Sequence, residues 1–262
     1  MLRDALFHGR YAAEYYDKLM AGSGCGGYLE TAHTYRESAS IIATELRRRN
    51  PDGTRLLEVG CGTGNFCIEF AKLGFIVKGT DFSRDLLKRA RQKSPATITY
   101  TFADMRDFIE RKRFDYLVCL FDTFTYNQSI AEVRKTLECM KHALNDGGVL
   151  ALDYHCSKPT KTEISVTLPG IALSNGQTIK ETVYIRSNGN MTLRRSVQKI
   201  FCRNTLIKER TVPRLPRLRL NRTTIKALLR NAGFTTVTIN AGFDGQQPQH
   251  LLIYATKKHR TK

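Results

Sequence analysis

The chain has 262 residues, of which 41% are hydrophobic and 25% are charged. This length and balance indicate a folded protein with a conventional core, and they exclude a fibrous, disordered or disulfide-stapled class. The formal net charge is +18, because 42 Lys and Arg outnumber 24 Asp and Glu. A positive field of this size attracts polyanions or anionic small molecules.

The sequence carries no sign of a membrane segment or a secretion signal. No stretch reaches the apolar length of a membrane span, and the first residues, MLRDALFHGR, lack the apolar run of a signal peptide. We therefore expect a cytoplasmic protein with no membrane partner. The seven cysteines are scattered, without a Cys-x-x-Cys motif or zinc-ligand spacing to His, so we expect reduced thiols and neither a disulfide nor a metal.

Two helices and then a series of strand and helix units are expected along the first half of the chain. The helices at residues 9–20 and about 29–49 are joined by the glycine-rich AGSGCGGYLE. Short apolar runs then alternate with amphipathic stretches, which is typical of a parallel sheet. The expected strands are 55–59, 75–80, 97–102, 114–120 and 148–154, and the expected helices are about 64–73, 83–93 and 129–144.

The fifth strand is expected to follow a glycine turn and to lead into an insertion. Asn145-Asp146-Gly147-Gly148 should end the preceding helix, since glycine tolerates the positive φ of a helix C-terminus. Between Ser157 and about Leu220 the sequence is strand-like, with Pro-Gly, Ser-Asn-Gly and Arg-Asn turn signals, which predicts an inserted antiparallel meander. The chain then returns with a helix from Asn221 or Arg222 and two strands, TTVTINA and HLLIYATK.

The positive charge is concentrated in and around this insertion. From His155 to Arg230, 16 Lys or Arg face three Glu, an excess of 13 positive charges. The charge therefore belongs mainly to one segment rather than to the whole surface.

A glycine-rich loop, LLEVGCGTGNF, follows the first predicted strand and opens a helix, where an α/β sheet binds its cofactor. Gly60, Gly62 and Gly64 are spaced G-x-G-x-G, whereas the dinucleotide fingerprint requires a glycine where Asn65 stands. Glu58 supplies a carboxylate that can pair with an ammonium group and would repel a pyrophosphate. The loop therefore predicts contact with an amino acid rather than with a phosphate.

Two further acidic residues follow the next two strands. Asp81 can accept hydrogen bonds from a ribose diol, and Asp104 is placed to receive an adenine amino group. With Glu58, they would face an ammonium, a ribose and an adenine in turn, which describes S-adenosylmethionine. Each acidic residue taken alone could instead cap the helix that follows it, but the ordered set favours the cofactor.

Five motifs in order resemble those of class I S-adenosylmethionine-dependent methyltransferases: LLEVGCGTGNF, GTDFSRDLLKRAR, FADMRDF, FDYLVCLFDTFTY and LNDGGVLALDYH. The resemblance spans most of the chain. It implies an α/β fold with a Rossmann-like, seven-stranded sheet in the order 3-2-1-4-5-7-6, helices on both faces and an antiparallel last strand. It also implies S-adenosylmethionine as donor, S-adenosylhomocysteine as product and no metal. The implied cofactor site comprises Tyr16, Glu58, Gly60, Cys61, Gly62, Asn65, Phe66, Asp81, Phe82, Ala103, Asp104, Met105, Leu120 and Phe121.

On this resemblance the chain divides into three parts. Residues 1–50 are expected to be helices that cover the active site, and residues 51–156 with 221–257 the cofactor-binding domain. Residues 157–220 are expected to be the basic insertion, acting as a lid over the acceptor or as a dimer contact through its sheet edge. Both a monomer and a homodimer remain open.

A narrower resemblance concerns the acceptor. The segment from Ala13 to Asp17, the motif FDTFTY and the strand-rich insertion resemble small-molecule N-methyltransferases, including nucleotide-aminosugar N,N-dimethyltransferases and glycine methyltransferases. In the aminosugar enzymes, the tyrosine matching Tyr16 lies near the transferred methyl, and the residue matching Tyr126 is a histidine near the acceptor nitrogen. The tyrosine at position 126 therefore leaves the acceptor open.

The expected chemistry is in-line methyl transfer. A sulfonium methyl is already electrophilic, so the protein mainly has to align donor and acceptor and exclude water. An amine must arrive neutral and a hydroxyl must lose a proton, and Tyr16, Tyr126, His155 and Asp122 are the candidates to assist. We expect the acceptor to be an amine, or a hydroxyl, of a small and anionic molecule. The two tyrosines could instead be packing residues, and His155 could be structural.

The basic insertion leaves other functions open. Its arginines could bind the phosphates of tRNA or rRNA in an enzyme that methylates a base or ribose. Against this, the insertion offers only Tyr184 and Phe201 for base stacking. The charge could also be a solvated face. A non-catalytic binding module is a third hypothesis, which the intact glycine loop and cleft acids disfavour.

Overall fold

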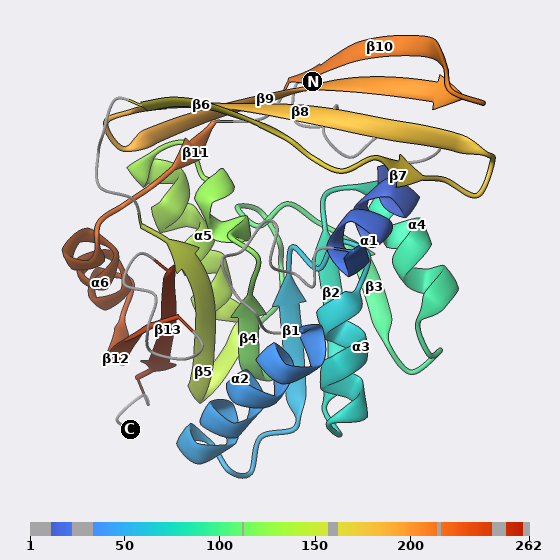
Figure 1. Cartoon of the computed structure of the whole chain (residues 1–262). Helices are drawn as coiled ribbons and strands as arrows, with labels where there is room; N and C mark the ends of the chain where they lie inside the picture. Colours follow the sequence, from blue (N-terminus) through green and yellow to red (C-terminus); the bar gives the residue numbers. More distant parts are fainter. Residues whose placement is uncertain are drawn as a thin grey trace.

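The computed structural model describes residues 12–22, 34–111, 113–156, 162–213, 216–242 and 250–258. Figure 1 shows a central sheet with helices on both sides, and a second sheet that lies across one end of it. No helix in these ranges has the length and apolar composition needed to cross a membrane. The predicted connection AGSGCGGYLE beyond Gly22, residues 243–249 and both chain ends lie outside the described residues.

The central sheet has seven strands in the order β12-β13-β5-β4-β1-β2-β3. Strands β1 to β5 run parallel to one another, and β13 is antiparallel to both of its neighbours. The predicted strand order, with an antiparallel last strand, is therefore confirmed. The strands are β1 (Arg55–Val59), β2 (Ile76–Asp81), β3 (Thr99–Phe102), β4 (Phe114–Cys119), β5 (Leu144–His155), β12 (Phe234–Ala241) and β13 (His250–Lys257).

Helices cover the central sheet on both faces, as predicted. Successive residues of a strand point to opposite faces, so Leu57 and Leu117 join one apolar cluster and Leu56 and Val118 the other. Helices α5 and α6 pack in the first cluster, and α2, α3 and α4 in the second. The helices are α1 (Ala12–Gly22), α2 (Tyr35–Arg49), α3 (Asn65–Lys72), α4 (Arg84–Lys93), α5 (Ile130–Ala143) and α6 (Arg222–Asn231), with a short 3-10 helix η2 (Thr123–Tyr126).

Two predicted boundaries differ from the structure by four residues or more. Helix α2 begins at Tyr35 and not near residue 29, because Thr34 has extended backbone and forms a capping box with Glu37. Strand β5 begins at Leu144 and not at residue 148. Gly147 has a φ of +79° inside this strand, where its register against β4 shifts, so the glycine turn forms an irregularity within the strand.

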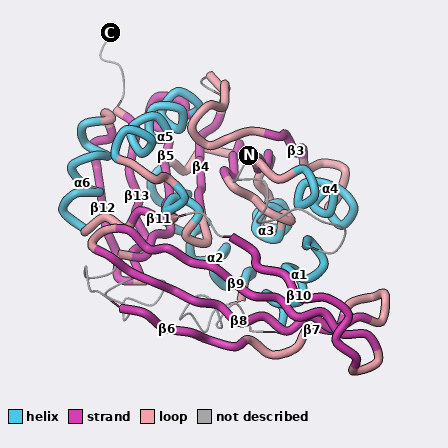
Figure 2. Tube along the Cα trace, turned by 90° about the horizontal axis from the view of Figure 1, so that it is seen from above, coloured by secondary structure: helices cyan, strands magenta, loops and turns pink. Residues whose placement is uncertain are grey.

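The insertion forms a second, antiparallel sheet in the order β10-β9-β8-β6, which confirms the predicted meander. Short strands β7 and β11 pair with β8 and β9. The sheet lies over the carboxyl ends of the parallel strands (Figure 1), and Figure 2 shows its long strands from above. Its strands are β6 (Thr162–Thr167), β7 (Ile171–Ala172), β8 (Gln177–Asn188), β9 (Met191–Cys202), β10 (Thr205–Pro213) and β11 (Arg217–Leu218).

Helix α1 connects the two layers. The Tyr15 hydroxyl donates to Glu181 of β8 at 2.6 Å. On another side of the helix, the Asp17 carboxylate accepts a hydrogen bond from Thr63 in the glycine loop at 2.5 Å. One helix is thus bonded both to the second sheet and to the loop after β1.

The close packing beneath the glycine loop gives a stability prediction. A Cβ added to Gly79 of β2 would lie 2.8 Å from the Cys61 sulfur and 2.8 Å from the ring of Tyr100. We expect Gly79→Ala to lower the free energy of unfolding by about 1–3 kcal/mol, because a packed core tolerates an added methyl poorly. Urea unfolding followed by circular dichroism measures this loss. Gly170→Ala, at an exposed position, is the control, and an equal loss in both variants would contradict the packing argument.

Candidate active site

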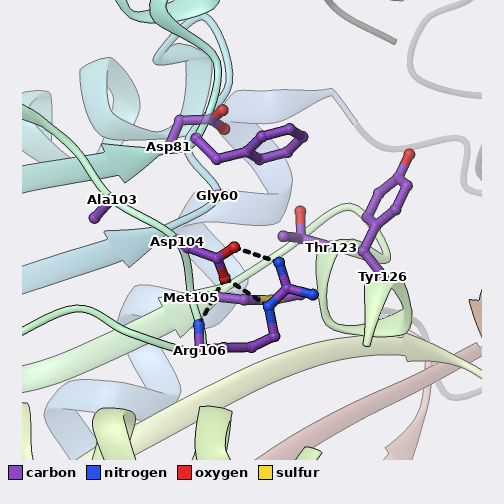
Figure 3. A pocket seen from close by; sticks show the side chains of 9 residues that line it. Gly60, Asp81, Ala103, Asp104, Met105, Arg106, Thr123 and Tyr126 are labelled. Carbon is purple, nitrogen blue, oxygen red and sulfur yellow. Dashed lines mark hydrogen bonds and ion pairs between the residues drawn. The ribbon is translucent and has the colours of Figure 1, made fainter. Parts of the chain in front are cut away.

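A pocket opens at the carboxyl ends of the parallel strands. In a parallel α/β sheet these ends meet at one edge, which is where ligands bind. Figure 3 shows the lining side chains converging from four chain segments. The lining residues are Gly60, Asp81, Phe82, Ala103, Asp104, Met105, Arg106, Thr123 and Tyr126.

The glycine loop is fixed against β2 by its own main chain. The amides of Gly60 and Cys61 both donate to the Thr80 carbonyl, at 2.7 and 2.9 Å. Gly60, Gly62 and Gly64 all have positive φ, between +56° and +78°, which residues with a Cβ rarely adopt. The glycines are therefore required by the backbone path, and the loop presents main chain at the floor of the pocket.

Asp81 lies where the sequence predicts, at the pocket wall. Its carboxylate accepts hydrogen bonds from the amides of Gly62 at 2.9 Å and Ser83 at 2.8 Å. Burial raises the pKa of this carboxyl to about 6. An ionised carboxylate offers about four lone-pair sites, so its bonds to the amides of Gly62, Ser83 and Phe82 leave capacity for a hydroxyl group of a ligand.

Asp104 also lines the pocket, but it is already paired. The guanidinium of Arg106 bonds to both carboxylate oxygens of Asp104, one of them at 2.7 Å from Nε (Figure 3). The same guanidinium reaches Glu132 at 3.0 Å. The sequence argument missed Arg106, although it stands two residues after Asp104 in the motif FADMRDF. A basic residue two positions after a predicted binding acid was the sequence signal that could have identified this pair.

Glu58 lies beneath the glycine loop and does not line the pocket. Its side chain is only 3% exposed, and its carboxyl oxygen is 2.9 Å from the Cys67 sulfur. Burial raises the pKa of Glu58 to about 8, so the neutral acid predominates at pH 7. In this structure the Glu58 carboxyl therefore contacts Cys67 beneath the loop and not the pocket.

The other predicted cofactor residues belong to the glycine loop or lie near it, and the pocket lining does not include them. Phe66 and Phe121 pack with Tyr35, with ring centroids 5.0–5.2 Å apart. The Asn65 side chain accepts a hydrogen bond from Lys93. The predicted residues outside the pocket lining are Tyr16, Glu58, Cys61, Gly62, Asn65, Phe66, Leu120 and Phe121.

Tyr16 is placed over the glycine loop by α1. A Cβ added to Gly62 would lie 3.9 Å from the Tyr16 hydroxyl oxygen. The neighbouring Asp17 holds the helix in place by accepting from Thr63, from Lys93 at 2.8 Å and from Arg89 at 2.9 Å. Burial raises the pKa of Tyr16 well above its ordinary value, so its hydroxyl stays neutral. Sequence reasoning did not identify Asp17 as a contact of the loop.

Tyr126 lines the pocket from η2 and is held by an arginine of the insertion. Nη2 of Arg217 donates to the Tyr126 hydroxyl at 2.7 Å, and the guanidinium lies 4.6 Å from the ring centroid. Arg217 sits on β11, about ninety positions away in the chain. No local pattern in the sequence could indicate this contact.

The same arginine bonds to the buried carboxylate of Asp122. This carboxylate also accepts from Arg219 at 3.3 Å and from the amide of His155 at 3.0 Å. Burial alone would raise its pKa, but the interaction with the His155 side chain and the charges of Arg219 and Arg217 hold the pKa well below its usual range. Asp122 therefore stays ionised at all physiological pH values.

Asp122 and Phe121 form a strained corner at the end of β4. Both residues have positive φ, +60° and +55°, which costs about 1–3 kcal/mol for residues other than glycine. The Phe121 amide donates to Asp153 at 3.0 Å, and the Asp122 side chain has the partners just described. These bonds hold a backbone conformation that places η2, with Thr123 and Tyr126, at the pocket.

His155 lies beside this corner and does not line the pocket. Its Nδ1 is 3.7 Å from Asp122, and its ring stacks on that of His250 at 4.4 Å with an interplanar angle of 6°. His250 in turn bonds to Asp153. The donor atoms of Asp153, His155 and His250 lie within 4.8 Å of one another, but the in-plane lone pairs of two parallel imidazoles do not converge on one ion.

Comparison with known proteins agrees with this geometry. The methyltransferase-domain family profile matches residues 56–148. A protein of Geobacillus sp. (strain WCH70) whose name describes it as a methyltransferase is 30% identical over 244 residues, which are 90% of this chain and 92% of the relative.

A second relative is dTDP-3-amino-3,4,6-trideoxy-alpha-D-glucopyranose N,N-dimethyltransferase of Streptomyces venezuelae, 28% identical over 165 residues, or 63% of this chain and 69% of that protein. The solved structure of SAM-bound CalS10, an amino pentose methyltransferase from Micromonospora echinaspora, superposes with a TM-score of 0.73. It has 24% identity and covers 93% of this chain and 96% of that one, a likeness of fold. With the seven-stranded sheet and the glycine loop, these matches show that the chain belongs to the class I S-adenosylmethionine-dependent methyltransferases.

Proposed function

We propose that this enzyme transfers a methyl group from S-adenosylmethionine to an amine of a small, anionic molecule. The observation that carries the proposal is the position of Tyr126 between two environments. Its ring lines the pocket with Asp81, and its hydroxyl is bonded to the buried Arg217 of the overlying sheet. Tyr126 thus contacts both the proposed pocket for the methyl donor and the buried cation of the second sheet.

The residues of the pocket fit the donor. Asp81 retains acceptor capacity for a ribose diol, and Phe82, Ala103 and Met105 supply apolar surface for an adenine. Asp104 can still offer a lone pair to an amino group beside its bond to Arg106. Gly60 lets a ligand approach the main chain closely. Glu58, buried under the loop, supports this site from below.

The bound donor supplies an electrophilic methyl group on a sulfonium. The amine attacks this methyl with its lone pair, a carbon–nitrogen bond forms, and the carbon–sulfur bond breaks with its electron pair left on sulfur. Tyr16, above the glycine loop, and Tyr126, across the pocket, confine the reacting groups and exclude water. Their hydroxyls orient the amine.

His155, which does not line the pocket, is the proposed acceptor, through one bridging water, of the proton that an ammonium must lose before it reacts. Its imidazole is half-buried next to the ionised Asp122, and a carboxylate stabilises the imidazolium that forms. Asp122 itself keeps its negative charge throughout, because Arg217 and Arg219 remain bonded to it.

Relatives with named acceptors support an amine. The Streptomyces venezuelae relative is named for N,N-dimethylation of a nucleotide-linked aminosugar, an acceptor that combines an amine with anionic groups. Two cations of the second sheet, Arg194 and Arg217, also favour a compact anion over a long polyanion, because their side chains are buried within the protein. A surface for RNA would present such side chains to solvent.

The role of Asp81 gives a prediction about donor binding. We expect Asp81→Asn to weaken the affinity for S-adenosylhomocysteine about 10- to 100-fold, the value of a hydrogen bond to a charged group. Calorimetric titration at pH 7.5 measures this effect. Because the pKa of Asp81 is about 6, the wild-type affinity should fall as the pH drops through 6, whereas that of the variant should not. Asp52→Asn, at an exposed position, is the control, and unchanged affinity in Asp81→Asn would overturn the assignment.

The role of Tyr126 gives a prediction about the acceptor. We expect Tyr126→Phe to lower kcat/KM for an amine acceptor at least about 10-fold, because the hydroxyl that orients the amine is lost. Affinity for S-adenosylhomocysteine should change less than about twofold. Transfer of a radiolabelled methyl to a panel of amino sugars, nucleotide-linked amino sugars and amino acids measures this. Tyr184→Phe, on the second sheet, is the matched control, and equal rates for the Tyr126 variant and wild type would refute the role.

The alternative acceptor, RNA, is tested by salt dependence. A protein that neutralises several phosphates loses affinity steeply with salt, about 10³- to 10⁵-fold between 50 and 200 mM for six to ten contacts. We expect weak binding of a tRNA transcript and no methylation of it. Filter binding across this salt range, with radiolabelled donor in parallel, provides the measurement. Steep salt dependence together with labelled tRNA would replace a small acceptor by RNA.

A further inference from the structure

The short helix η2 presents two hydroxyl side chains to the pocket. In a 3-10 helix three residues make one turn, so Thr123 and Tyr126 lie on the same face. Both line the pocket, whereas Phe124 and Thr125 between them are buried. Figure 3 shows the Thr123 hydroxyl and the Tyr126 ring rising from this turn on the side of the pocket. The turn therefore brings a second hydroxyl to the place where the acceptor is proposed to bind.

Thr123 is held against the glycine loop. A Cβ added to Gly60 would lie 2.2 Å from Cγ2 of Thr123 and 3.1 Å from its Oγ1. The main-chain amide of Thr123 donates to the Leu120 carbonyl at 3.2 Å. The methyl group of the threonine thus packs on the main chain at the floor of the pocket, which gives its hydroxyl a defined place on the pocket lining.

The Thr123 hydroxyl is uncommitted within the protein. It has no hydrogen bond to a residue that the structure describes, whereas the Thr125 hydroxyl donates to a main-chain carbonyl at 2.7 Å. Among the other side chains of the pocket, Asp81 is bonded to main-chain amides and Asp104 to Arg106. A hydroxyl offers one proton and two lone pairs, so Thr123 has unused capacity for a ligand.

The Tyr126 hydroxyl cannot serve a primary amine by itself. Arg217 carries donors only, so the phenol oxygen of Tyr126 accepts the bond of 2.7 Å between them, and this bond occupies one of its lone pairs. A neutral primary amine keeps its own lone pair for the sulfonium methyl and presents two N–H groups. An N–H that is buried without an acceptor is costly, so such an amine needs a second acceptor beside Tyr126. Thr123, on the same face of the turn, supplies this acceptor.

We propose that Thr123 accepts a hydrogen bond from the acceptor amine and so makes the enzyme selective for primary amines. This deepens and rests on the proposed function, in which Tyr126 orients the amine. A primary amine engages both hydroxyls, whereas a secondary amine has one N–H and engages only one of them. Each transfer forms a carbon–nitrogen bond and leaves the carbon–sulfur electron pair on sulfur.

The number of N–H groups falls with each round of methylation. After a transfer, the product ammonium releases one proton to solvent, so that a methyl group has replaced one N–H. The N-methyl product then returns to the pocket with one contact fewer. A site built to bond to an N–H discriminates against an analogue that lacks it, so the first methylation is favoured over the second.

The chain supplies a matched control for this proposal. Thr123→Val removes the hydroxyl but keeps a branched side chain on Gly60, whereas Thr123→Ser keeps the hydroxyl and removes the methyl group. Thr125→Val makes the same chemical change two positions away, where the hydroxyl is bonded to the main chain and does not line the pocket. A purely structural effect on the turn would slow both classes of amine, whereas loss of a contact to the substrate changes the preference between them.

The experiment compares a primary amine with its own N-methyl derivative. Glucosamine is paired with N-methylglucosamine and glycine with N-methylglycine, and the pair that wild type methylates better is used to measure kcat/KM with radiolabelled donor. We expect Thr123→Val to lower kcat/KM about 10- to 100-fold for the primary amine and less than about threefold for the secondary amine, because only the primary amine needs both acceptors. Thr123→Ser should recover most of the loss. Thr125→Val should change both amines by the same factor.

A binding measurement separates this role from an effect on the donor. Calorimetric titration should show that Thr123→Val binds S-adenosylhomocysteine within about twofold of the wild-type affinity, since the hydroxyl serves the acceptor. An equal fall of kcat/KM for both amines, no fall for the primary amine, or a loss of donor affinity would each overturn the role of Thr123. Absence of methyl transfer from wild type to any amine would overturn the proposed function, and this inference with it. Should Thr123→Val fail to fold by circular dichroism, Thr123→Ala removes the same hydroxyl and carries the comparison.

Discussion

The arrangement of this site depends on the hydrogen bonds and ion pairs of the buried Asp122 carboxylate. This carboxylate accepts hydrogen bonds from the main-chain amide of His155 in β5 and from two arginines of the insertion, Arg217 and Arg219. Burying a charge is expensive, and removing one partner of such a group leaves the others buried without compensation. The carboxylate therefore holds the second sheet in a defined place above the parallel strands, and with it the arginine that contacts Tyr126.

The strained backbone at the end of β4 is held in place by the same network of bonds. The left-handed backbone of Phe121 and Asp122 turns the chain abruptly into η2, which brings Tyr126 to the pocket. Asp153 and His250 support this corner from β5 and β13. Strain that is held by several surrounding bonds is typical of functional sites, where a side chain must stand in a position that relaxed backbone does not reach. Helix α1 closes the opposite side through Tyr15 and Asp17.

The distribution of charge is as important as its amount. The net charge of +18 is compatible with nucleic acid, membrane surface or small anions as partners. Within the second sheet, however, adjacent arginines serve different environments: Arg194 is buried toward the pocket side and Arg195 is exposed. Exposed charge is screened by salt, whereas charge buried beside the pocket, such as that of Arg217, is screened much less.

The sequence by itself determined the parallel sheet, its strand order, the glycine loop and the inserted meander. These depend on local periodicity, on glycines that the backbone requires and on acids that end strands, all of which are visible along the chain. The sequence also predicted a common site for Asp81, Phe82, Ala103, Met105 and Tyr126, because parallel strands end at a common edge, and these residues do line one pocket. Tertiary structure alone decided that Glu58 is buried, that Asp104 is paired with Arg106, and that Arg217 bonds to Tyr126 and Asp122. The reason is physical: the depth of a side chain and its partners across some ninety positions arise from packing between layers, which no local pattern records.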